Sequence, residues 1–209
     1  MVNFKVVDMY QGDRVKSFKK ARDKGIVGII HKATTGQTGS DKEYANRRQA
    51  ALDAGLLWGA YHWGTAKDVD KQVANFLKTA TPDAKTLVAL DFEPTPDNTM
   101  SLAQARDFLT KIQEELGRKA IIYSGHLIKD ELGNKKDAFF GSHRLWLAQY
   151  ANAPVTQKSW DKPWIWQYTD GKSGPNPKSV DGIPGDSQGR LDCNSYEGSD
   201  TKLAQEWAS

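Results

Sequence analysis

The chain has 209 residues, of which 38% are hydrophobic and 26% are charged, and its formal net charge is +3 at pH 7. This composition is typical of a globular protein, and it argues against a disordered chain and, because no apolar run approaches 18 residues, against a membrane-spanning one. The basic residues are dispersed, so we expect no nucleic-acid partner. A single cysteine, Cys193, excludes an internal disulfide, and the N-terminus lacks the three regions of a signal peptide.

Predicted strands and helices alternate through the first 132 residues. Apolar runs predict strands at 4–8, 27–33, 57–63, 87–90 and 120–124. Apolar residues at helical spacing, together with capping signals, predict helices at 13–24, 40–54, 65–77, 101–116 and 127–132. Ser40 with Glu43 and Ser101 with Gln104 form the two expected capping boxes, and Thr65 is the expected start of the third helix. This order predicts a parallel sheet with right-handed crossovers.

The rhythm changes after residue 132. Three further strands are predicted at 145–150, 164–168 and 190–195, but the segments between them, 151–163 and 169–189, are rich in Pro and Gly and show no helical period. Five strand–helix units followed by three strands predict an α/β fold, a single TIM-like barrel of irregular (β/α)5(β)3 type. An open sheet with an antiparallel edge is the alternative. Without a repeat or linker, residues 1–209 are expected to form one domain.

Two carboxylates follow the apolar run 87–90. Asp91 and Glu93 are two residues apart, so on a strand they share one face, with Cα atoms roughly 6.5 Å apart. Pro94 and Pro96 cannot continue a central strand, which places both acids at its carboxyl end, where parallel sheets bind ligands. Taken alone, an Asp-x-Glu pair could also cap a helix, pair with a base or hold a metal.

In a barrel the carboxyl ends of all strands meet at one mouth, which brings further side chains beside this pair. The acids expected there are Asp8, Asp91, Glu93 and Asp192. They are expected to lie among the aromatic and amide residues Tyr61, His62, Trp63, Tyr123, Gln149, Tyr150, Gln167 and Tyr168. Carboxylates among aromatic rings suit glycoside hydrolysis, in which one acid stays protonated because like charges raise its pKa. The four histidines lack the spacing of a zinc site and no Gly-rich phosphate cradle is present, so we expect neither a metal nor a cofactor.

Six motifs in order resemble one known family. They are Val7-Asp8 with Tyr10-Gln11, Gly59 to Trp63, Leu90 to Glu93, Ile122-Tyr123-Ser124, Leu145 to Tyr150 with Ile165 to Tyr168, and Leu191 to Asn194. This series resembles the family 25 glycoside hydrolases, lysozymes that cleave peptidoglycan and include many phage endolysins. The resemblance implies a barrel of five βα units and three strands. Because the chain ends soon after the eighth predicted strand and shows no linker, we expect no appended wall-binding module.

The resemblance also implies an activity and a set of roles. The expected reaction is that of an N-acetylmuramidase on the β-1,4 bond between N-acetylmuramic acid and N-acetylglucosamine, performed by a monomer at the bacterial cell wall. Glu93 would be the general acid, assisted by Asp91, Asp8 and Asp192. The sugar subsites would be lined by Tyr61, Trp63, Tyr123, Trp146, Gln149 and Gln167. We expect secretion, or release to the wall by the phage endolysin route.

One position departs from the family, and two other functions stay open. After Lys32-Ala33-Thr34 the family usually has Glu, whereas this chain has Thr35. The alternatives are an inactive carbohydrate-binding barrel and a glycosidase that acts on chitin-like polymers. Because no second nucleophile is obvious opposite Glu93, our hypothesis for the mechanism is retention assisted by the substrate's N-acetyl group, with Asp91 stabilising it.

Overall fold

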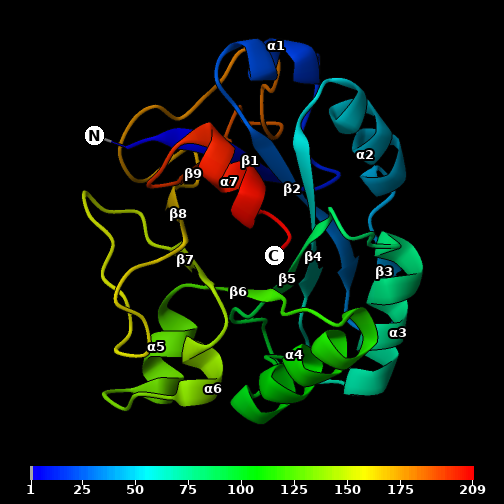
Figure 1. Ribbon diagram of the computed structural model, residues 1–209, viewed down its shortest axis with the longest axis vertical. Coiled ribbons are helices and arrows are strands. Elements are labelled where there is room, and N and C mark those ends of the chain that lie inside the picture. Colours follow the sequence, from blue (N-terminus) through cyan, green and yellow to red (C-terminus); the bar gives the residue numbers. More distant parts are fainter. Residues whose placement is uncertain (1) are drawn as a thin grey trace.

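The computed structural model describes residues 2–209 and contains a closed barrel. Its strands are β1 (Phe4–Met9), β2 (Gly28–Thr35), β3 (Gly39–Ser40), β4 (Leu57–Trp63), β5 (Leu87–Asp91), β6 (Ile121–Ser124), β7 (Leu145–Ala148), β8 (Ile165–Thr169) and β9 (Asp192–Ser195). The order is β1-β9-β8-β7-β6-β5-β4-β2, and a β1–β2 pairing closes the ring, with β3 attached to β2 (Figure 1). The predicted eight-stranded TIM-like barrel is confirmed, and the open-sheet alternative is wrong.

Helices surround much of the barrel. They are α1 (Phe18–Asp23), α2 (Tyr44–Asp53), α3 (Val69–Ala80), α4 (Leu102–Leu116), α5 (His126–Leu132), α6 (Ala138–Gly141) and α7 (Asp200–Glu206). The first six lie outside the barrel, whereas loops cover the side formed by β8 and β9, and α7 crosses one end (Figure 1). Within residues 2–209, no helix combines the length and apolar composition needed to cross a membrane.

Alternation along the strands divides the apolar residues into two layers. Val6, Ile30 and Leu87 belong to the cluster inside the barrel, whereas their neighbours Val7 and Ile29 belong to the cluster beneath the helices. Successive strand residues point to opposite faces, so a residue two positions after an inward-facing one is again inward-facing. This is why acids placed at alternate positions near the strand ends point into the barrel mouth.

The amino end of the barrel is closed by residues from α7 onward. The Trp207 indole is 1% exposed, its Nε1 donates to the carbonyl of Trp58 at 2.7 Å, and it packs directly over Gly28. A Cβ atom at Gly28 would lie only 2.5 Å from this indole, so the residue must be glycine for the two to pack. Trp207 therefore closes this end of the barrel.

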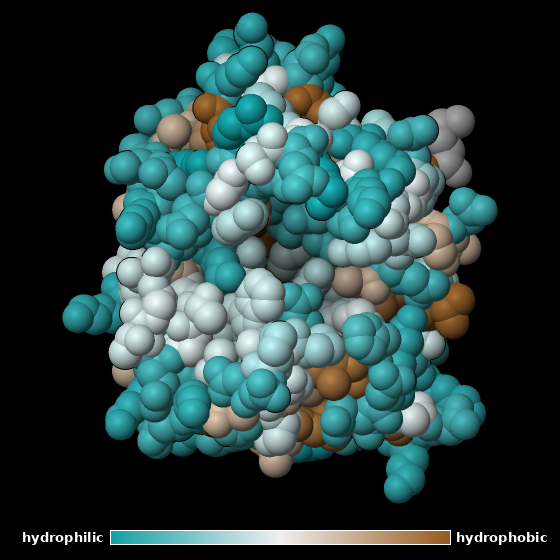
Figure 2. All heavy atoms as spheres, turned by 180° about the vertical axis from the view of Figure 1, so that it is seen from behind, coloured by the Kyte–Doolittle hydropathy of each residue, from teal (hydrophilic) through white to brown (hydrophobic). Residues whose placement is uncertain are grey.

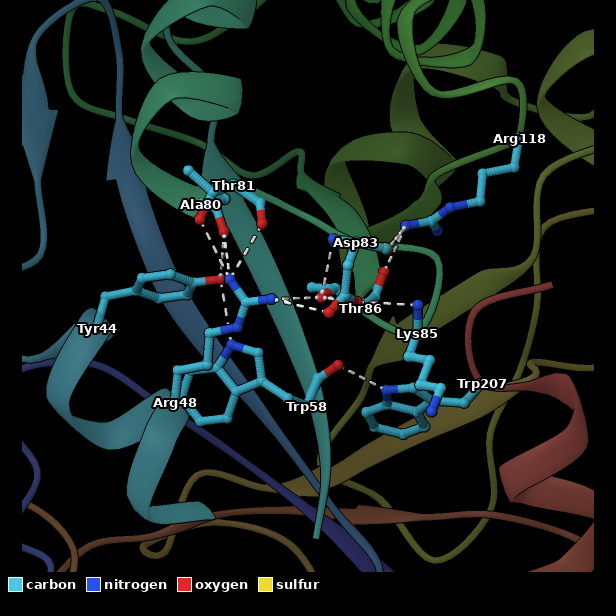
Figure 3. A network of polar contacts seen from close by, with 10 residues as sticks. All are labelled: Tyr44, Arg48, Trp58, Ala80, Thr81, Asp83, Lys85, Thr86, Arg118 and Trp207. Carbon is cyan, nitrogen blue, oxygen red and sulfur yellow. Dashed lines mark hydrogen bonds and ion pairs between the residues drawn. The ribbon is translucent and has the colours of Figure 1, made fainter. Parts of the chain in front are cut away.

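A network of hydrogen bonds joins the elements around this closed end (Figure 3). The Arg48 guanidinium donates to the carbonyls of Ala80 and Thr81, at 3.1 and 3.0 Å, and to the Asp83 carboxylate at 3.2 Å. These carbonyls belong to the last residue and the C-cap residue of α3, where the carbonyls of the last helical turn have no partners within the helix. The network thus fixes α2 against the loop that leads into β5.

Several predicted element boundaries are wrong. Ser40 lies in β3 and caps no helix; α2 begins at Tyr44 with Glu43 as its N-cap residue and no side-chain cap. The N-cap of α3 is Asp68, not Thr65. Only the second half of the helix predicted at 13–24 forms, because Arg14 pairs instead with Gly185. The Ser101 capping box is confirmed.

Three short elements were not predicted. They are β3, α6 and α7, none longer than seven residues. The direction of the last strand is also a finding, since β9 is antiparallel to both β1 and β8. Asp192 therefore reaches the mouth as the first residue of its strand, opposite Asp8, rather than as a residue near its carboxyl end.

Candidate active site

A cleft of about 410 Å³ occupies the barrel mouth opposite α7. Figure 2 shows this face of the molecule, which is hollowed near its centre. The residues around the cleft are Asp8, Tyr10, Lys32, Tyr61, Trp63, Asp91, Glu93, Tyr123, Trp146, Tyr150, Gln167 and Asp192. It combines four carboxylates with six aromatic rings, one amide and a single lysine. No three His, Cys, Asp or Glu side chains of residues 2–209 are grouped closely enough to hold a metal ion.

Asp91 is the most deeply buried acid of the cleft. It ends β5, is 4% exposed, and its Oδ1 has no hydrogen-bond partner among the described residues. Burial, and then the charge of Glu93, hold the pKa of Asp91 well above its usual range. A buried, unpaired carboxylate oxygen is costly to the fold, so this group is positioned to meet a donor or a positive charge from a bound molecule.

Glu93 lies two residues beyond Asp91 and faces the same cleft. Burial raises the pKa of Glu93, and the positive charge of Lys32 opposes this rise. Between the two acids, Phe92 points outward into the core and its backbone N–H donates to the Tyr123 carbonyl at 2.9 Å, which anchors the turn. A carboxyl group with a raised pKa, accessible from a cleft, can act as a general acid near neutral pH.

Asp8 is held by two amides. Gln167 Nε2 donates to both carboxylate oxygens at 3.0 Å, and Asn194 Nδ2 donates to Oδ1 at 2.7 Å. Burial nevertheless raises the pKa of Asp8 to about 6, because desolvation outweighs the hydrogen bonds that favour its charged form. Asp8 is therefore a fixed acceptor whose charge changes close to neutral pH.

Both amides are themselves oriented by neighbouring groups. The hydroxyls of Tyr123 and Tyr150 each donate to Gln167 Oε1 at 2.9 Å, which leaves its NH2 group to face Asp8. Trp146 Nε1 donates to Asn194 Oδ1 at 2.6 Å. Asn194 was not predicted as a site residue, although its position two residues after Asp192 on a strand could have indicated it.

Two further acids lie near Asp8. Asp192 is opposite Asp8 in the β1–β9 register, and burial followed by the charge of Asp8 raises its pKa well above the usual range. Asp13 accepts a hydrogen bond from the Tyr10 backbone N–H at 2.8 Å, and burial raises its pKa to about 6. This side of the mouth is thus rich in carboxyl groups that repel one another.

Lys32 is the cation among the cleft-lining residues. Its Nζ lies 4.0 Å from the centre of the Trp63 ring, and none of the described carboxylates lies within 4.0 Å of it to form an ion pair. Burial lowers the pKa of Lys32, while the charges of Asp91, Asp41 and Glu93 oppose this change. One face of the Trp63 ring is therefore covered by the ammonium group, which limits this ring as a platform for a sugar.

The structure brings together nearly all the predicted site residues. Asp8, Asp91, Glu93 and Asp192 line the cleft, as do Tyr61, Trp63, Tyr123, Trp146 and Gln167. The exception is Gln149, which lies in an adjoining pocket beyond Glu93. Trp146 is 1% exposed and forms part of the floor. Tyr150 lines the cleft as expected, whereas Tyr168 belongs to the core outside the barrel and was wrongly expected at the mouth. Tyr10 and Lys32 also line the cleft, although they were not among the predicted site residues.

Thr35, the departure from the family pattern, lies outside the cleft. It ends β2 and pairs with Gly39 of β3 and with Trp63 of β4. His62 is also outside, since it faces the helices, contacts Thr34 and Gln72, and stacks on Phe108. Burial lowers its pKa to about 4, so it is a neutral wall residue.

A closed barrel with a carboxylate-rich cleft at the carboxyl ends of its strands suits glycoside hydrolysis. The family profile of glycosyl hydrolases family 25 matches residues 7–176. This protein belongs to that family. The predicted resemblance to this family is thereby confirmed.

Individual relatives agree with this assignment. The chain is similar to the autolytic lysozyme of Clostridium acetobutylicum, with 29% identity over 191 residues, which cover 87% of this chain but 53% of that protein. Two solved structures have the same fold. The lysozyme of Streptomyces coelicolor has a TM-score of 0.83 with 22% identity, covering 100% of this chain and 98% of that chain. The family GH25 lysozyme of Aspergillus fumigatus has a TM-score of 0.78 with 25% identity, covering 100% of both chains.

Proposed function

We propose that this protein is an N-acetylmuramidase that hydrolyses the β-1,4 bond between N-acetylmuramic acid and N-acetylglucosamine in peptidoglycan. The observation that carries the proposal is the Asp91–Glu93 pair, two acids with raised pKa values that face one cleft lined by aromatic side chains. Family membership supports the reaction class. The chain spans 53% of the length of its clostridial relative, so the activity is proposed for this barrel by itself, acting as a monomer and single catalytic domain.

Glu93 is the general acid in this proposal. It is less buried than Asp91, and its raised pKa favours the protonated form, which can give its proton to the leaving oxygen. Asp91 and Asp8 face the same cleft, and in their ionised forms they stabilise the positive charge that develops at the sugar carbon. Asp192 completes the acidic wall opposite Glu93.

The proposed mechanism is retention assisted by the substrate's own N-acetyl group. Asp91 has a buried carboxylate oxygen without a partner, and the N–H of an acetamido group that attacks the sugar carbon would supply the missing donor. The N-acetyl oxygen forms the bond to the sugar carbon as the glycosidic bond breaks and Glu93 protonates the leaving oxygen. A covalent glycosyl adduct on any aspartate would contradict this mechanism.

The rim of the cleft supplies the sugar-binding surfaces. Tyr10 and Tyr150 are 43% and 40% exposed and lie on the rim, where large rings can contact the apolar faces of sugars. Tyr61 and Tyr123, each 8% exposed, line the floor with Trp146. The substrate would thus be the glycan strand of the bacterial cell wall, where the protein acts after secretion or release.

Product analysis tests this proposal. Purified peptidoglycan is treated with the protein or with its Glu93→Gln variant, the soluble products are reduced with borohydride, and the new ends are identified by mass spectrometry. Muramitol ends from the parent and none from the variant are expected. Glucosaminitol ends would indicate a different cleavage site, and release from chitin but not from peptidoglycan would favour the chitin-like substrate. An absence of products from the parent would favour a binding barrel.

A further inference from the structure

A second pocket adjoins the catalytic cleft on the side of β6 and β7. Its volume is about 370 Å³, and it shares Glu93, Tyr123 and Tyr150 with the cleft. Its other lining residues are Pro94, Gly125, His126, Lys129, Ala148 and Gln149. Figure 1 shows α5, which carries Lys129, beside β7 on this side of the barrel. A polymer bound in the cleft would therefore reach this pocket directly beyond the general acid.

Lys129 provides this pocket with a positive charge that forms no ion pair with the described residues. Its Nζ donates to Gln149 Oε1 at 2.8 Å, and among residues 2–209 no carboxylate lies within 4.0 Å of it. The side chain is partly buried, and burial lowers its pKa. An ammonium group has three N–H donors, of which one is used by Gln149, so the others are available to a ligand.

Gln149 positions Lys129 through its side-chain oxygen, which is therefore not free to bind a sugar. Its Oε1 accepts a second hydrogen bond from the Val155 backbone N–H at 3.1 Å, and its backbone carbonyl accepts one from Trp166 Nε1 at 2.7 Å. The amide oxygen is therefore fully used. In this arrangement Gln149 is a positioning residue for Lys129, which differs from the direct sugar contact expected from the sequence.

The charges on the two sides of Glu93 are opposite. On the β1 and β9 side lie Asp8, Asp13 and Asp192. Burial raises the pKa of all three, and the charge of Asp8 also raises the pKa values of Asp13 and Asp192, so an additional anion there would be repelled. On the β6 and β7 side, Lys129 attracts one. A glycan strand that carries carboxylates on alternate sugars would bind with a carboxylate-bearing branch directed toward Lys129.

We propose that Lys129, held by Gln149, binds a carboxylate on the lactyl–peptide branch of the glycan strand and so selects peptidoglycan over neutral polymers of N-acetylglucosamine. This inference rests on the proposed function, because it names the part of that substrate which occupies the pocket beyond Glu93. It assigns a ligand of defined chemistry, a carboxylate, to a pocket next to the reacting bond.

Binding measurements test the proposal without turnover. In the Glu93→Gln background, calorimetry compares a peptidoglycan tetrasaccharide that carries its stem peptides with the same compound after its carboxylates are converted to amides. Lys129→Met should weaken binding of the first by about 5- to 20-fold, as expected for a partly exposed charge-assisted hydrogen bond, and of the second by less than about 2-fold. Lys129→Arg should retain most of the affinity.

Lys136→Met is the matched control, because Lys136 is exposed and lies outside both pockets. It should leave both affinities unchanged. A loss shared equally by the two ligands, or no loss from Lys129→Met, would overturn the proposal. Glycan freed of its stem peptides is a third ligand, in which the lactyl carboxyl is no longer bonded to the stem and is a free carboxylate. A Lys129 effect that persists shows that the pocket also binds the lactyl carboxylate, and one that disappears assigns the carboxylate to the stem peptide alone.

The outcome is independent of the test for the proposed function. If the parent protein cleaves peptidoglycan but Lys129→Met binds both ligands normally, the muramidase assignment stands and the Lys129 assignment fails. If the parent releases no products but carboxylate binding still depends on Lys129, the reverse holds.

Discussion

The two ends of the barrel differ in how their polar groups are satisfied. At the closed end, Arg48 and Arg118 donate to carbonyls and to the Asp83 side chain, so most charges there have partners (Figure 3). At the mouth, Asp91 and Asp192 are buried beside other acids, and one Asp91 oxygen has no partner. At one end of the strands the polar groups thus have hydrogen-bond partners and stabilise the fold. At the other end the buried acids lie beside one another, which suits binding and chemistry.

The largest expected effect is on catalysis at the mouth. Glu93→Gln removes the proton donor while keeping the shape of the side chain, so we expect kcat to fall about 10³- to 10⁴-fold. The free energy of unfolding should stay the same or rise, because a charge near Asp91 is removed. Rates of release of soluble glycan and denaturation curves measure the two quantities. The exposed Glu115→Gln serves as control; a comparable loss there would contradict the assignment.

The next largest effect is expected on the free energy of unfolding and not on catalysis. Trp207→Ala removes the indole that closes the amino end of the barrel, and we expect a loss of about 3–5 kcal/mol in the free energy of unfolding, typical of a large buried aromatic. Because Trp207 lies at the end opposite the cleft, kcat should stay within about 2-fold of the parent's value under conditions where the variant is folded. Urea denaturation and turnover at low temperature give the two values. A large fall in kcat would show that the two ends are coupled.

A smaller effect of opposite sign is expected at Asp91. Its pKa is raised in the folded state, so the folded protein binds the proton more tightly than the unfolded chain does. The contribution of this proton binding to the stability of the fold is fully present below the ordinary Asp pKa of about 3.9. It is lost as the pH rises through the raised pKa of Asp91 in the folded protein. Asp91→Asn should therefore be more stable than the parent at pH 7, by about 1–2 kcal/mol, and less active. The difference in the free energy of unfolding between variant and parent should vanish near pH 3. An equal difference at pH 3 and pH 7 would contradict this explanation.

Much of this contrast could be predicted from local sequence, and some of it could not. Asp91 and Glu93 were placed correctly in the cleft because a strand fixes which face alternate residues share. The partners of Asp8 were not predicted as such, since Gln167 and Asn194 come from strands more than 150 residues away and their contacts depend on the antiparallel direction of β9. The closing helix α7 was missed because its seven residues bury only Leu203, too few to show a period.

The helix predicted at 13–24 shows how distant contacts override local pattern. Val15, Phe18 and Ala21 have helical spacing, but the backbone at Arg14 and Lys16 bonds to Gly185 and Gly182 and holds this segment in a loop. That loop carries Asp13 into the acidic side of the mouth. The wrong helix prediction was thus also the reason why Asp13 was not expected near the site.

The smallest effect is expected at Lys32, the cation among the cleft-lining residues, and it concerns the pKa of Glu93. Lys32 lowers the pKa of Glu93, so Lys32→Met should raise it and move the alkaline limb of the pH–rate profile to higher pH, by up to about one unit. Lys32→Arg, which keeps the charge, should restore the limb, and the exposed Lys158→Met should not move it. A shift to lower pH would mean that the limb reports a group other than Glu93. If the alkaline limb stays in place while KM rises, Lys32 binds substrate and does not change the pKa of Glu93. The buried acids at the mouth would then obtain their partners from the substrate alone.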